Sequence, residues 1–548
     1  MALSLLVQIP LGIILAVLGS ILWKLRPFIV GQFMSPLLNL KGPRSSSWFY
    51  GNLNDKHNSE DTMVYDQWIE QYGPVLSYRG FFNMPRMMTT DTRAINHVLT
   101  HSAVYQKPEQ AQRTLSRLLG NGVLIAEGKR DQHRQQRRVM NPAFGPSQIR
   151  ELTEIFVEKS IELRDVWAAE LEEKGEPTRI NVVRGLSKMT LDVIGLAGFN
   201  YEFNALNPVG KPNELAKAFE EIFTFPDKIP ILLILQNFFP VFNIIKDTRA
   251  RRIARARAAM ARIGSELIAQ KKAEILRESS EKNGSVGRQS LQGRDLLTLL
   301  IKANMATDIP DSQRLSDEDV LARAFLVAGH ETTSTATTWC LYALTQSPDV
   351  QRKLREELLT VDTDTPTMDE LNALPYLDMV IRESLRLYAP VPDSVRVPIK
   401  DDAIPLDKPF TDRRGQVHDH IKVAKDDPIV IPIKSMNRLK SIWGEDSYEF
   451  RPERWESPPE PTSSIPGVWA HLLTFLGGPR ACIGYRFSIV EMKALIFTLV
   501  RAFEFELAVP RAQIKKKDGI VQRPTCRDDP TGSPQMPLLV RRYNPNRA

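Results

Sequence analysis

The chain has 548 residues, of which 42% are hydrophobic and 25% charged, a globular composition. Its three cysteines, Cys340, Cys482 and Cys526, are too few and too far apart for a disulfide framework, which indicates a reducing compartment. The net charge of +7 suits an anionic membrane surface or an acidic protein partner, whereas dispersed basic residues argue against a nucleic-acid partner.

The N-terminal segment, residues 2–23, is uncharged and is followed by Lys24 and Arg26. At about 1.5 Å per helical residue it can span a hydrocarbon core about 30 Å thick. The alternative is a cleaved signal peptide, which would need a positive n-region, a shorter apolar stretch and a small-residue cleavage site. We expect an uncleaved transmembrane helix over residues 1–23, with all that follows in the cytosol. The sequon at Asn283 should then carry no glycan.

Residues 24–54 form a loop-like connector, in which Gly42-Pro43 and Gly51-Asn52 mark turns. Residues 55–548 contain no Gly/Ser linker, repeat or low-complexity tract, so we expect one large domain there. Its hydrophobic periodicity predicts a mainly α-helical domain with a minor β-sheet region. Long helices are expected at 149–172, 249–277, 317–345, 349–359, 368–388 and 488–500.

Residues 229–245 form an apolar segment that Pro230 and Pro240 interrupt. It is too short to span a bilayer cleanly, and two interpretations stay open. One is a buried core segment, and the other is a surface element that dips into lipid beside a route for apolar substrate. The basic run at 249–264 is most simply a solvated helix face.

Cys482 lies in the stretch FLGGPRACIGYRFSIVEMKAL, residues 475–495, between glycines and just before a helical run. It could be a buried structural cysteine, a nucleophile with a distant His partner, or a metal ligand. Zinc would need clustered Cys and His ligands. The pair His418 and His420 lacks further local ligands, and we interpret it as a turn or strand end.

One axial thiolate on a haem iron accounts for each special residue of this stretch. A buried thiolate needs N–H donors and a positive helix end, which the following helix offers to Cys482. Gly478 and Gly484 would let the backbone approach the sulfur and a flat macrocycle, where a Cβ would collide. Arg480 can reach a haem propionate, and Phe475 can pack over the loop.

The pattern F-x-x-G-x-R-x-C-x-G at residues 475–484 resembles the complete haem-binding signature of the cytochrome P450 family. The resemblance runs from about residue 42 to residue 507, and it implies the fold of that family. Three further motifs stand in the family's order: AGHETTS at 328–334, ESLR at 383–386 and FRPERW at 450–455.

The resemblance also implies roles for residues outside the cysteine stretch. Glu331 and Thr332 match the acid and alcohol that hold water and relay protons to dioxygen, with a merely helix-stabilising pair as the alternative. Glu383 and Arg386 are three residues apart and can pair on one helix face. The resemblance implies that Arg454 joins them in a buried network that shapes the cysteine stretch, whereas an exposed pair would contribute only about 0–1 kcal/mol.

Three positions would contact the haem edge. His133 stands where the family usually has Trp, and its imidazole N–H can donate the same hydrogen bond. Arg137 follows four residues later, where the family has an arginine that meets a propionate. Arg396 resembles a third propionate partner.

The resemblance implies a haem-thiolate monooxygenase in the endoplasmic reticulum membrane, similar to fungal members of the family. It would bind haem b and a small apolar organic substrate, such as a terpenoid or a foreign aromatic compound. Electrons would come from NADPH through a separate cytochrome P450 reductase, with cytochrome b5 as a further donor. The expected docking residues are Arg130, Arg134 and Arg138.

Two rival functions stay open at this stage. One is a haem-thiolate enzyme that rearranges or dehydrates a peroxide without a reductase. Such relatives typically lose the acid–alcohol pair, so an intact Glu331-Thr332 argues against it. The other is a haem-binding sensor without enzymatic activity.

Overall fold

The computed structural model describes most of the chain, which falls into two compact units. Unit 1 comprises Met1–Pro108 and Asp393–Ser435, and unit 2 comprises Glu109–Pro392 and Met436–Ala548. The expected domain boundaries at residues 23 and 54 stay a prediction. The described residues are 19, 33–59, 63–119, 122–127, 130–207, 231–238, 242, 245, 248–281, 295–305, 323–517, 519–529 and 531–547.

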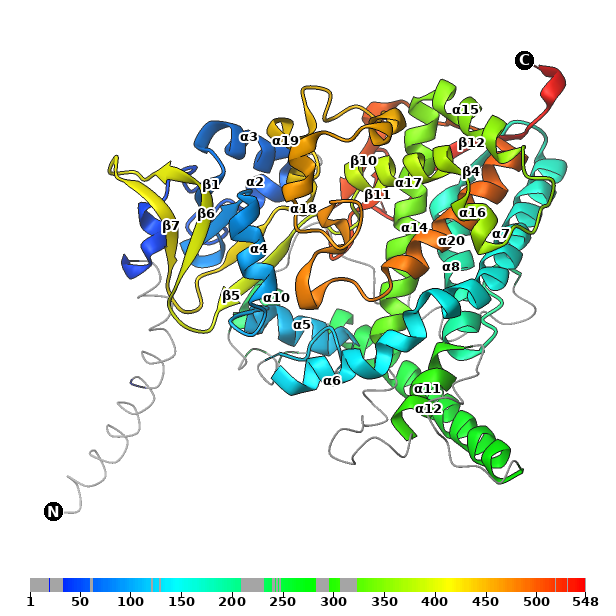
Figure 1. Ribbon diagram of the computed structural model, residues 1–548, viewed down its shortest axis with the longest axis horizontal. Helices are drawn as coiled ribbons and strands as arrows, with labels where there is room; N and C mark the ends of the chain where they lie inside the picture. The colour runs from blue at the N-terminus through cyan, green and yellow to red at the C-terminus, as the bar shows by residue number, and fades with distance from the viewer. Residues whose placement is uncertain are drawn as a thin grey trace. The chain divides into compact units, whose positions relative to one another are not determined.

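Unit 1 is built on a mixed sheet with the strand order β1–β2–β8–β5–β3 (Figure 1). Strands β2 and β8 are parallel, and the other neighbouring strands are antiparallel. Strands β6 and β7 form a separate antiparallel pair. The bounds are β1 (Val75–Arg79), β2 (Pro85–Thr89), β3 (Tyr105–Gln106), β5 (Ser394–Pro398), β6 (Asp402–Thr411), β7 (Val417–Val423) and β8 (Ile429–Ile431).

A buried carboxylate fixes a helix of unit 1 to its β6–β7 sheet. Asp91 caps helix α4 (Thr92–Thr100) by accepting a hydrogen bond from Ala94 N. The same carboxylate accepts from the backbone N–H of Asp407 on β6. The residue that caps α4 therefore also holds α4 to β6, through Asp407, which lies 316 residues further along the chain. The other helices of unit 1 are α2 (Leu53–Asn58) and α3 (Met63–Tyr72).

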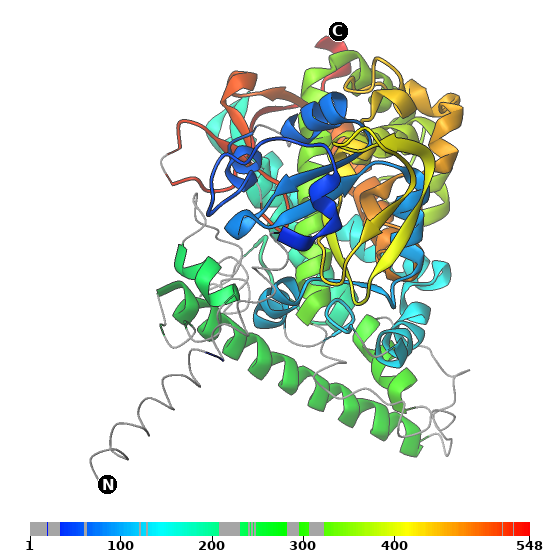
Figure 2. The ribbon, with the colours of Figure 1, turned by 90° about the vertical axis from the view of Figure 1, so that its left-hand side faces the viewer.

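Unit 2 is mainly helical. Its longest helix, α11, is prominent in Figure 2. The helices are α5 (Glu109–Leu119), α6 (Arg130–Met140), α7 (Pro146–Lys174), α8 (Val182–Phe199), α10 (Ile231–Phe238), α11 (Thr248–Glu281), α12 (Leu296–Met305), α14 (Arg323–Gln346), α15 (Pro348–Leu358), α16 (Met368–Asn372), α17 (Pro375–Leu387), α19 (Lys440–Trp443) and α20 (Tyr485–Ala502). A short helix, α18 (Ile433–Met436), lies where the chain passes from unit 1 to unit 2.

Two small sheets complete unit 2. The first has the order β4–β12–β9, and the second pairs β10 with β11. All of these neighbours are antiparallel. The bounds are β4 (Thr178–Asn181), β9 (Phe503–Leu507), β10 (Ile514–Lys517), β11 (Arg523–Cys526) and β12 (Pro537–Arg542).

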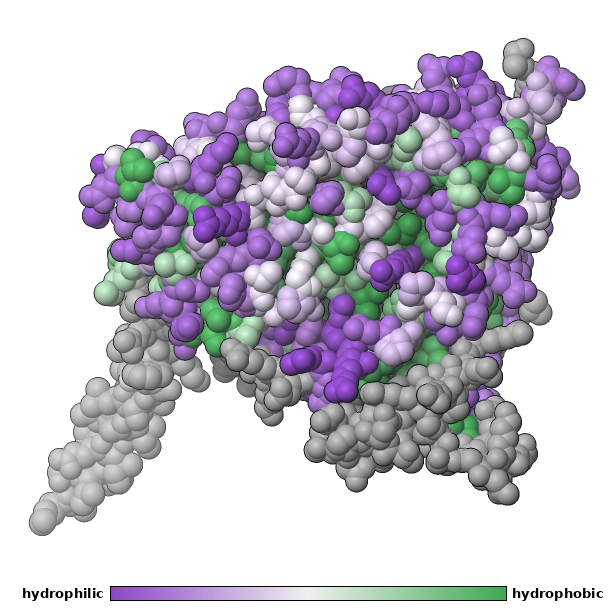
Figure 3. Space-filling model, viewed as in Figure 1, coloured by the Kyte–Doolittle hydropathy of each residue, from purple (hydrophilic) through white to green (hydrophobic). Residues whose placement is uncertain are grey.

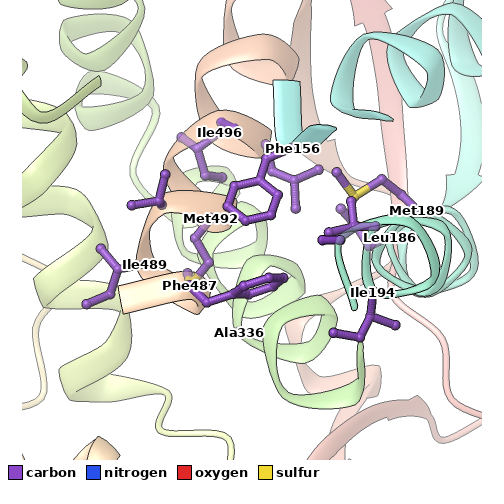
Figure 4. Close-up of a cluster of buried hydrophobic side chains, with 14 of the residues drawn as sticks. Phe156, Leu186, Met189, Ile194, Ala336, Phe487, Ile489, Met492 and Ile496 are labelled. Atoms are coloured by element: carbon purple, nitrogen blue, oxygen red, sulfur yellow. The ribbon is translucent and has the colours of Figure 1, made fainter. Parts of the chain in front are cut away.

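The core of unit 2 holds helices α7, α8, α14 and α20 together. Figure 4 shows side chains of all four helices meeting there. The rings of Phe156 on α7 and Phe487 on α20 lie edge to face, with centroids 4.7 Å apart. Ala336 leaves room for α14 to approach its neighbours, and both Phe156 and Ala336 are buried. This packing fixes α14 and α20, which carry two of the sequence motifs.

Helix boundaries follow local signals. Pro146 occupies the first turn of α7, where its missing N–H costs nothing, and Gly175 ends the helix at a φ of +85°. The stretch expected as one helix at 368–388 is instead two helices, because Pro375 starts a new one after Asn372. The periodicity did not indicate α8, because that helix is buried on most sides and shows no polar face.

No helix among the described residues is long and apolar enough to cross a membrane. The expected anchor over residues 1–23 lies outside the described residues apart from Gly19, as does the sequon at Asn283. Segment 229–245 is described in part. Its helix α10 buries Ile234 and exposes Ile231, so both interpretations of this segment stay open.

Substituting Phe156→Ala should lower the free energy of unfolding by about 3–5 kcal/mol, because the cavity would lie between α7 and α20. Urea denaturation followed by circular dichroism measures the change. Leu276→Ala on α11 is the matched control, since this side chain is exposed and its loss should barely move the midpoint. Equal shifts for the two variants would contradict this account of the core.

Candidate active site

The cysteine loop, residues 475–484, turns sharply before helix α20. The backbone N–H of Cys482 donates to the carbonyl oxygen of Phe475, at 2.9 Å, and this bond closes the loop. Gly478 has a φ of +68°, a conformation that an L side chain rarely adopts. At Gly484 an added Cβ would lie 3.8 Å from the Phe144 ring, an ordinary contact, so the protein's own atoms do not demand glycine there.

Cys482 differs from the other two cysteines in its exposure to solvent. The residue is exposed, whereas Cys340 and Cys526 are buried. Burial nonetheless raises the pKa of the Cys482 thiol, and the N–H of Gly484 and the charge of Arg137 lower it. A partly enclosed thiol with a donor and a cation beside it is suited to bind a positively charged centre as a thiolate.

Helix α6 brings Arg137 to the cysteine loop. Arg137 donates to the carbonyl oxygen of Ala481 at 2.5 Å, one residue before the cysteine. His133 is buried one turn earlier on the same helix. Arg480 donates to the Ala126 carbonyl oxygen at 2.7 Å and to the Glu127 carboxylate at 2.8 Å. Both arginines therefore have protein partners through which the loop is held.

Helix α14 carries the predicted acid and alcohol on different parts of its surface. The hydroxyl of Thr332 donates to the Ala328 carbonyl oxygen at 2.6 Å, and these two residues are accessible. Glu331 is only 6% exposed, and its carboxylate forms an ion pair with Arg523 on β11. The hydroxyls of Thr333 and Ser488 lie 3.0 Å apart, which joins α14 to α20 near the cysteine loop.

Glu383, Arg386 and Arg454 form a buried ionic network, with exposed fractions of 0%, 0% and 3%. Arg386 binds both carboxylate oxygens of Glu383, at 2.8 and 2.9 Å, and Arg454 approaches the same carboxylate at 3.4 Å. The indole N–H of Trp455 and the backbone N–H of Arg451 also donate to it, each at 3.0 Å. Two guanidinium groups and two neutral donors thus compensate one buried carboxylate.

Asn437 connects this network to the cysteine loop. Arg386 donates to the Asn437 carbonyl oxygen at 3.0 Å. The side-chain oxygen of Asn437 accepts from Leu473 N, and its NH₂ group donates to Thr474 Oγ1. These two residues directly precede Phe475, whose carbonyl oxygen holds Cys482. A continuous run of hydrogen bonds therefore leads from the network to the thiol.

The residues of this region fit a haem with a single thiolate ligand. Cys482 offers an accessible sulfur whose charged form is favoured by Gly484 and Arg137. Gly484 adds no side chain beside the sulfur, and the accessible edge of α14 carries the small residue Ala328. Among the described residues there is no cluster of three or more His, Cys, Asp or Glu suited to a metal ion, so Cys482 would be the sole protein ligand.

A sequence model of the family described as cytochrome P450 matches residues 40–526. Cytochrome P450 monooxygenase 205 of Postia placenta is 57% identical, over 98% of both chains. Cytochrome P450 monooxygenase 128 of the same fungus is 55% identical, over 95% of both chains. The chain belongs to the cytochrome P450 family. It is also 33% identical to ganoderic acid synthetase of Ganoderma lucidum, over 92% of this chain and 94% of that one.

Family membership confirms the resemblance seen in the motifs and the mainly helical fold with minor sheets. This cytochrome P450 is a monooxygenase, and its family implies haem as the cofactor. The role of Cys482 as the haem ligand stays a prediction.

Arg396 of this cytochrome P450 belongs to unit 1. It is buried on β5, where its guanidinium donates to Ser394 Oγ at 2.7 Å and to the Val395 carbonyl oxygen at 2.9 Å. Its expected contact with a propionate stays a prediction.

Several residues of the P450 site were missed by the sequence analysis. Glu127, Asn437 and Arg523 lie outside the motifs, and each meets its partner across a long sequence separation. Their residue types gave no signal, because a single Glu, Asn or Arg is common on any protein surface. Only the packing of unit 2 brings them to the motif residues.

Substituting Glu383→Gln should destabilise this cytochrome P450 by about 3–5 kcal/mol, because the buried guanidinium of Arg386 would lose its anionic partner and Arg454 would keep only its pair with Asp446. Urea denaturation measures the loss. Asp349→Asn removes a pair of the same spacing, Asp349 with Arg352, that is largely exposed on α15. That control should unfold at nearly the parent midpoint, and an equal loss in both variants would refute the structural role of the buried network.

Proposed function

We propose that this cytochrome P450 is a membrane-anchored enzyme that takes electrons from NADPH through a separate flavoprotein reductase. One atom of dioxygen would enter an apolar organic substrate, and the other would leave as water. The observation that carries the proposal is Cys482, an exposed residue whose thiol has Gly484 and Arg137 beside it to favour its charged form.

Haem b would supply the centre at which dioxygen is activated. The protein's own residues divide the remaining tasks. Cys482 would hold the iron, and Gly484 and Arg137 would favour the ionised form of its sulfur against the effect of burial. Thr332, on the accessible edge of α14, would hold water or a hydroxyl group by hydrogen bonds. Glu331 would exchange protons with it from the adjacent position of the helix.

Electron delivery would take place through α6. Arg134 and Arg138 are exposed on this helix, which also carries Arg137 beside the cysteine loop. A cationic surface so close to the thiol suits an acidic partner protein. The partner is proposed to be the NADPH–cytochrome P450 reductase, with cytochrome b5 as a further donor.

The location would be the endoplasmic reticulum membrane, with the catalytic units facing the cytosol. Residues 1–23 are long and apolar enough for a membrane anchor. Phe33 and Met34, the first contiguous residues described after this segment, are each 75% exposed. Exposed apolar side chains beside an anchor are favoured at a lipid surface.

The substrate would be a small apolar molecule of fungal secondary metabolism or a foreign compound. A relative at 33% identity is named for the synthesis of ganoderic acid, and this supports a role in secondary metabolism. We propose a terpenoid as the first class to examine. A panel of apolar ligands, screened for a spin-state shift of the haem spectrum, would identify the compounds that bind.

A comparison of two reactions separates this function from its rivals. The full chain would be assayed with reductase and NADPH, and in parallel with hydroperoxide alone. We expect turnover to need NADPH and reductase. Turnover with hydroperoxide alone would favour a peroxide-rearranging enzyme, and carbon monoxide binding without NADPH consumption would favour a sensor.

Replacing the thiol should abolish the thiolate signature. The reduced, carbonylated Cys482→Ser variant should lack thiolate-type Soret absorption, because a hydroxyl does not give the iron the same negative sulfur ligand. Cys526→Ser is the matched control, since Cys526 is a buried free thiol on β11, and its spectrum should equal that of the parent. An unchanged spectrum in Cys482→Ser would overturn the proposal.

Removing residues 1–23 should release the protein from membranes. The full chain should stay in the pellet after alkaline carbonate extraction of microsomes, because its apolar segment would span the bilayer. A chain of residues 24–548 should move largely into the supernatant. Equal retention of the two forms would show that the segment is not the anchor.

A further inference from the structure

A buried polar cluster lies beside the accessible edge of α14. It consists of Ser187 on α8, His330 and Glu331 on α14, and Arg523 on β11. Helices α8 and α14 pack closely here. A Cβ added at Gly329 on α14 would lie 3.0 Å from the Ile194 side chain on α8. Polar groups at such an interface must be joined to one another, so the order of their contacts is informative.

His330 stands between a hydroxyl and a carboxylate. Its Nε2 lies 2.9 Å from Ser187 Oγ, and its Nδ1 lies 3.7 Å from Glu331 Oε1. An imidazole can accept a proton at one nitrogen and donate one from the other. The longer separation is within reach of a small side-chain movement or one bridging water. His330 is only 4% exposed, so its two ring nitrogens serve these neighbours rather than bulk solvent.

Arg523 fixes the orientation of Glu331. The guanidinium pairs with Oε2, which leaves Oε1 on the side of His330. The backbone before Arg523 is held on both sides: Gln522 N donates to the Pro390 carbonyl oxygen at 2.8 Å, and Trp339 Nε1 donates to the Gln522 carbonyl oxygen at 3.0 Å. These two hydrogen bonds hold the backbone next to Arg523, so the start of β11 positions the guanidinium beside Glu331.

The two ends of the cluster differ in their access. Ser187 is half-buried, whereas His330 is buried, so Ser187 is the more exposed residue of this pair. At the other end Glu331 directly precedes Thr332, which lies with Ala328 on the accessible edge of α14. The contacts thus run from the half-buried Ser187, through the buried imidazole of His330, to the carboxylate of Glu331 beside the predicted reaction site.

We propose that Ser187 and His330 relay protons to Glu331, and that Arg523 is the positioning residue that keeps Glu331 Oε1 turned toward His330. This inference rests on the proposed function. A proton enters His330 at Nε2 from Ser187, which regains one from water, and a proton leaves Nδ1 for Glu331. The ring is neutral before and after the transfer, no electron moves, and one proton passes from solvent to the carboxylate.

The charge state of His330 agrees with this role. Burial lowers the pKa of His330 below its usual value, Arg523 lowers it further, and Glu331 raises it. The ring is accordingly neutral at neutral pH and free to take up a proton at one nitrogen. The charged groups that act on it come from α14 and β11, and α8 contributes the hydroxyl of Ser187.

The first test measures the coupling of the three side chains by NMR, independently of turnover. The full-length holoenzyme with ¹⁵N-labelled histidine would be titrated, and the His330 signals would be assigned by their loss in His330→Gln. Arg523→Gln should raise the pKa of His330, and Glu331→Gln should lower it. Thr190→Val is the matched control, because Thr190 bonds only to backbone carbonyl oxygens of Ser187 and His330. If neither substitution shifts the titration, the cluster is not coupled and the proposal fails.

The second test measures proton supply. NADPH-dependent dioxygen uptake by the full chain with reductase would be followed in H₂O and in D₂O, without added substrate. His330→Gln and Ser187→Ala should slow uptake by about tenfold or more, the scale of a lost positioned proton donor, and should raise the solvent isotope effect. Thr190→Val should match the parent. Arg523→Gln should slow uptake, and Arg523→Lys should recover part of the rate.

The outcomes keep this inference apart from the proposed function. Each variant would first be checked for the thiolate-type Soret absorption of its carbon monoxide complex, which reports a folded haem site. Parent-like uptake and isotope effect in both His330→Gln and Ser187→Ala would overturn the relay and leave the monooxygenase assignment intact. Absence of the thiolate absorption in the parent itself would instead overturn the proposed function, while the NMR coupling would still report on the cluster.

Discussion

The buried carboxylate of Glu383 is the constraint on which the geometry of unit 2 depends. A carboxylate without exposure to water is costly, and here Arg386, Arg454, Trp455 and the backbone at Arg451 all donate to it. Because these donors come from α17 and from the segment around η8 (Pro452–Glu456), satisfying one charge fixes two distant parts of the chain. Arg386 also donates to the carbonyl oxygen of Asn437, whose side chain holds the residues that lead into the cysteine loop.

The contacts of the cysteine loop both position the Cys482 thiol and affect its pKa. Leu473 N donates to Asn437 just before the loop. Within the loop, Cys482 N donates to Phe475 and Arg137 donates to the Ala481 carbonyl oxygen. The thiol therefore has little freedom, and the same neighbours that position it also oppose the rise in its pKa caused by burial. Structural support and electrostatic tuning come from one set of contacts, as is common where a charged ligand must be kept in a largely apolar interior.

Different sides of helix α14 carry the predicted reaction site and the supporting polar cluster. Ala328 and Thr332 form the accessible edge, while His330 and Glu331 are buried against α8 and β11. A helix repeats every 3.6 residues, so five consecutive positions can reach both the reaction site and the supporting polar cluster. The outer surface is mostly hydrophilic with scattered apolar positions in the view of Figure 3.

The sequence by itself determined what is local. The pattern around Cys482 and the spacing of Glu383 and Arg386 act within a few residues, so their consequences could be predicted from spacing and residue type. Family membership followed from the order of these motifs. The tertiary structure alone decided the partners that arrive from far along the chain. Arg523 meets Glu331 across 192 residues, and such a contact is set by the packing of unit 2, which no local pattern encodes.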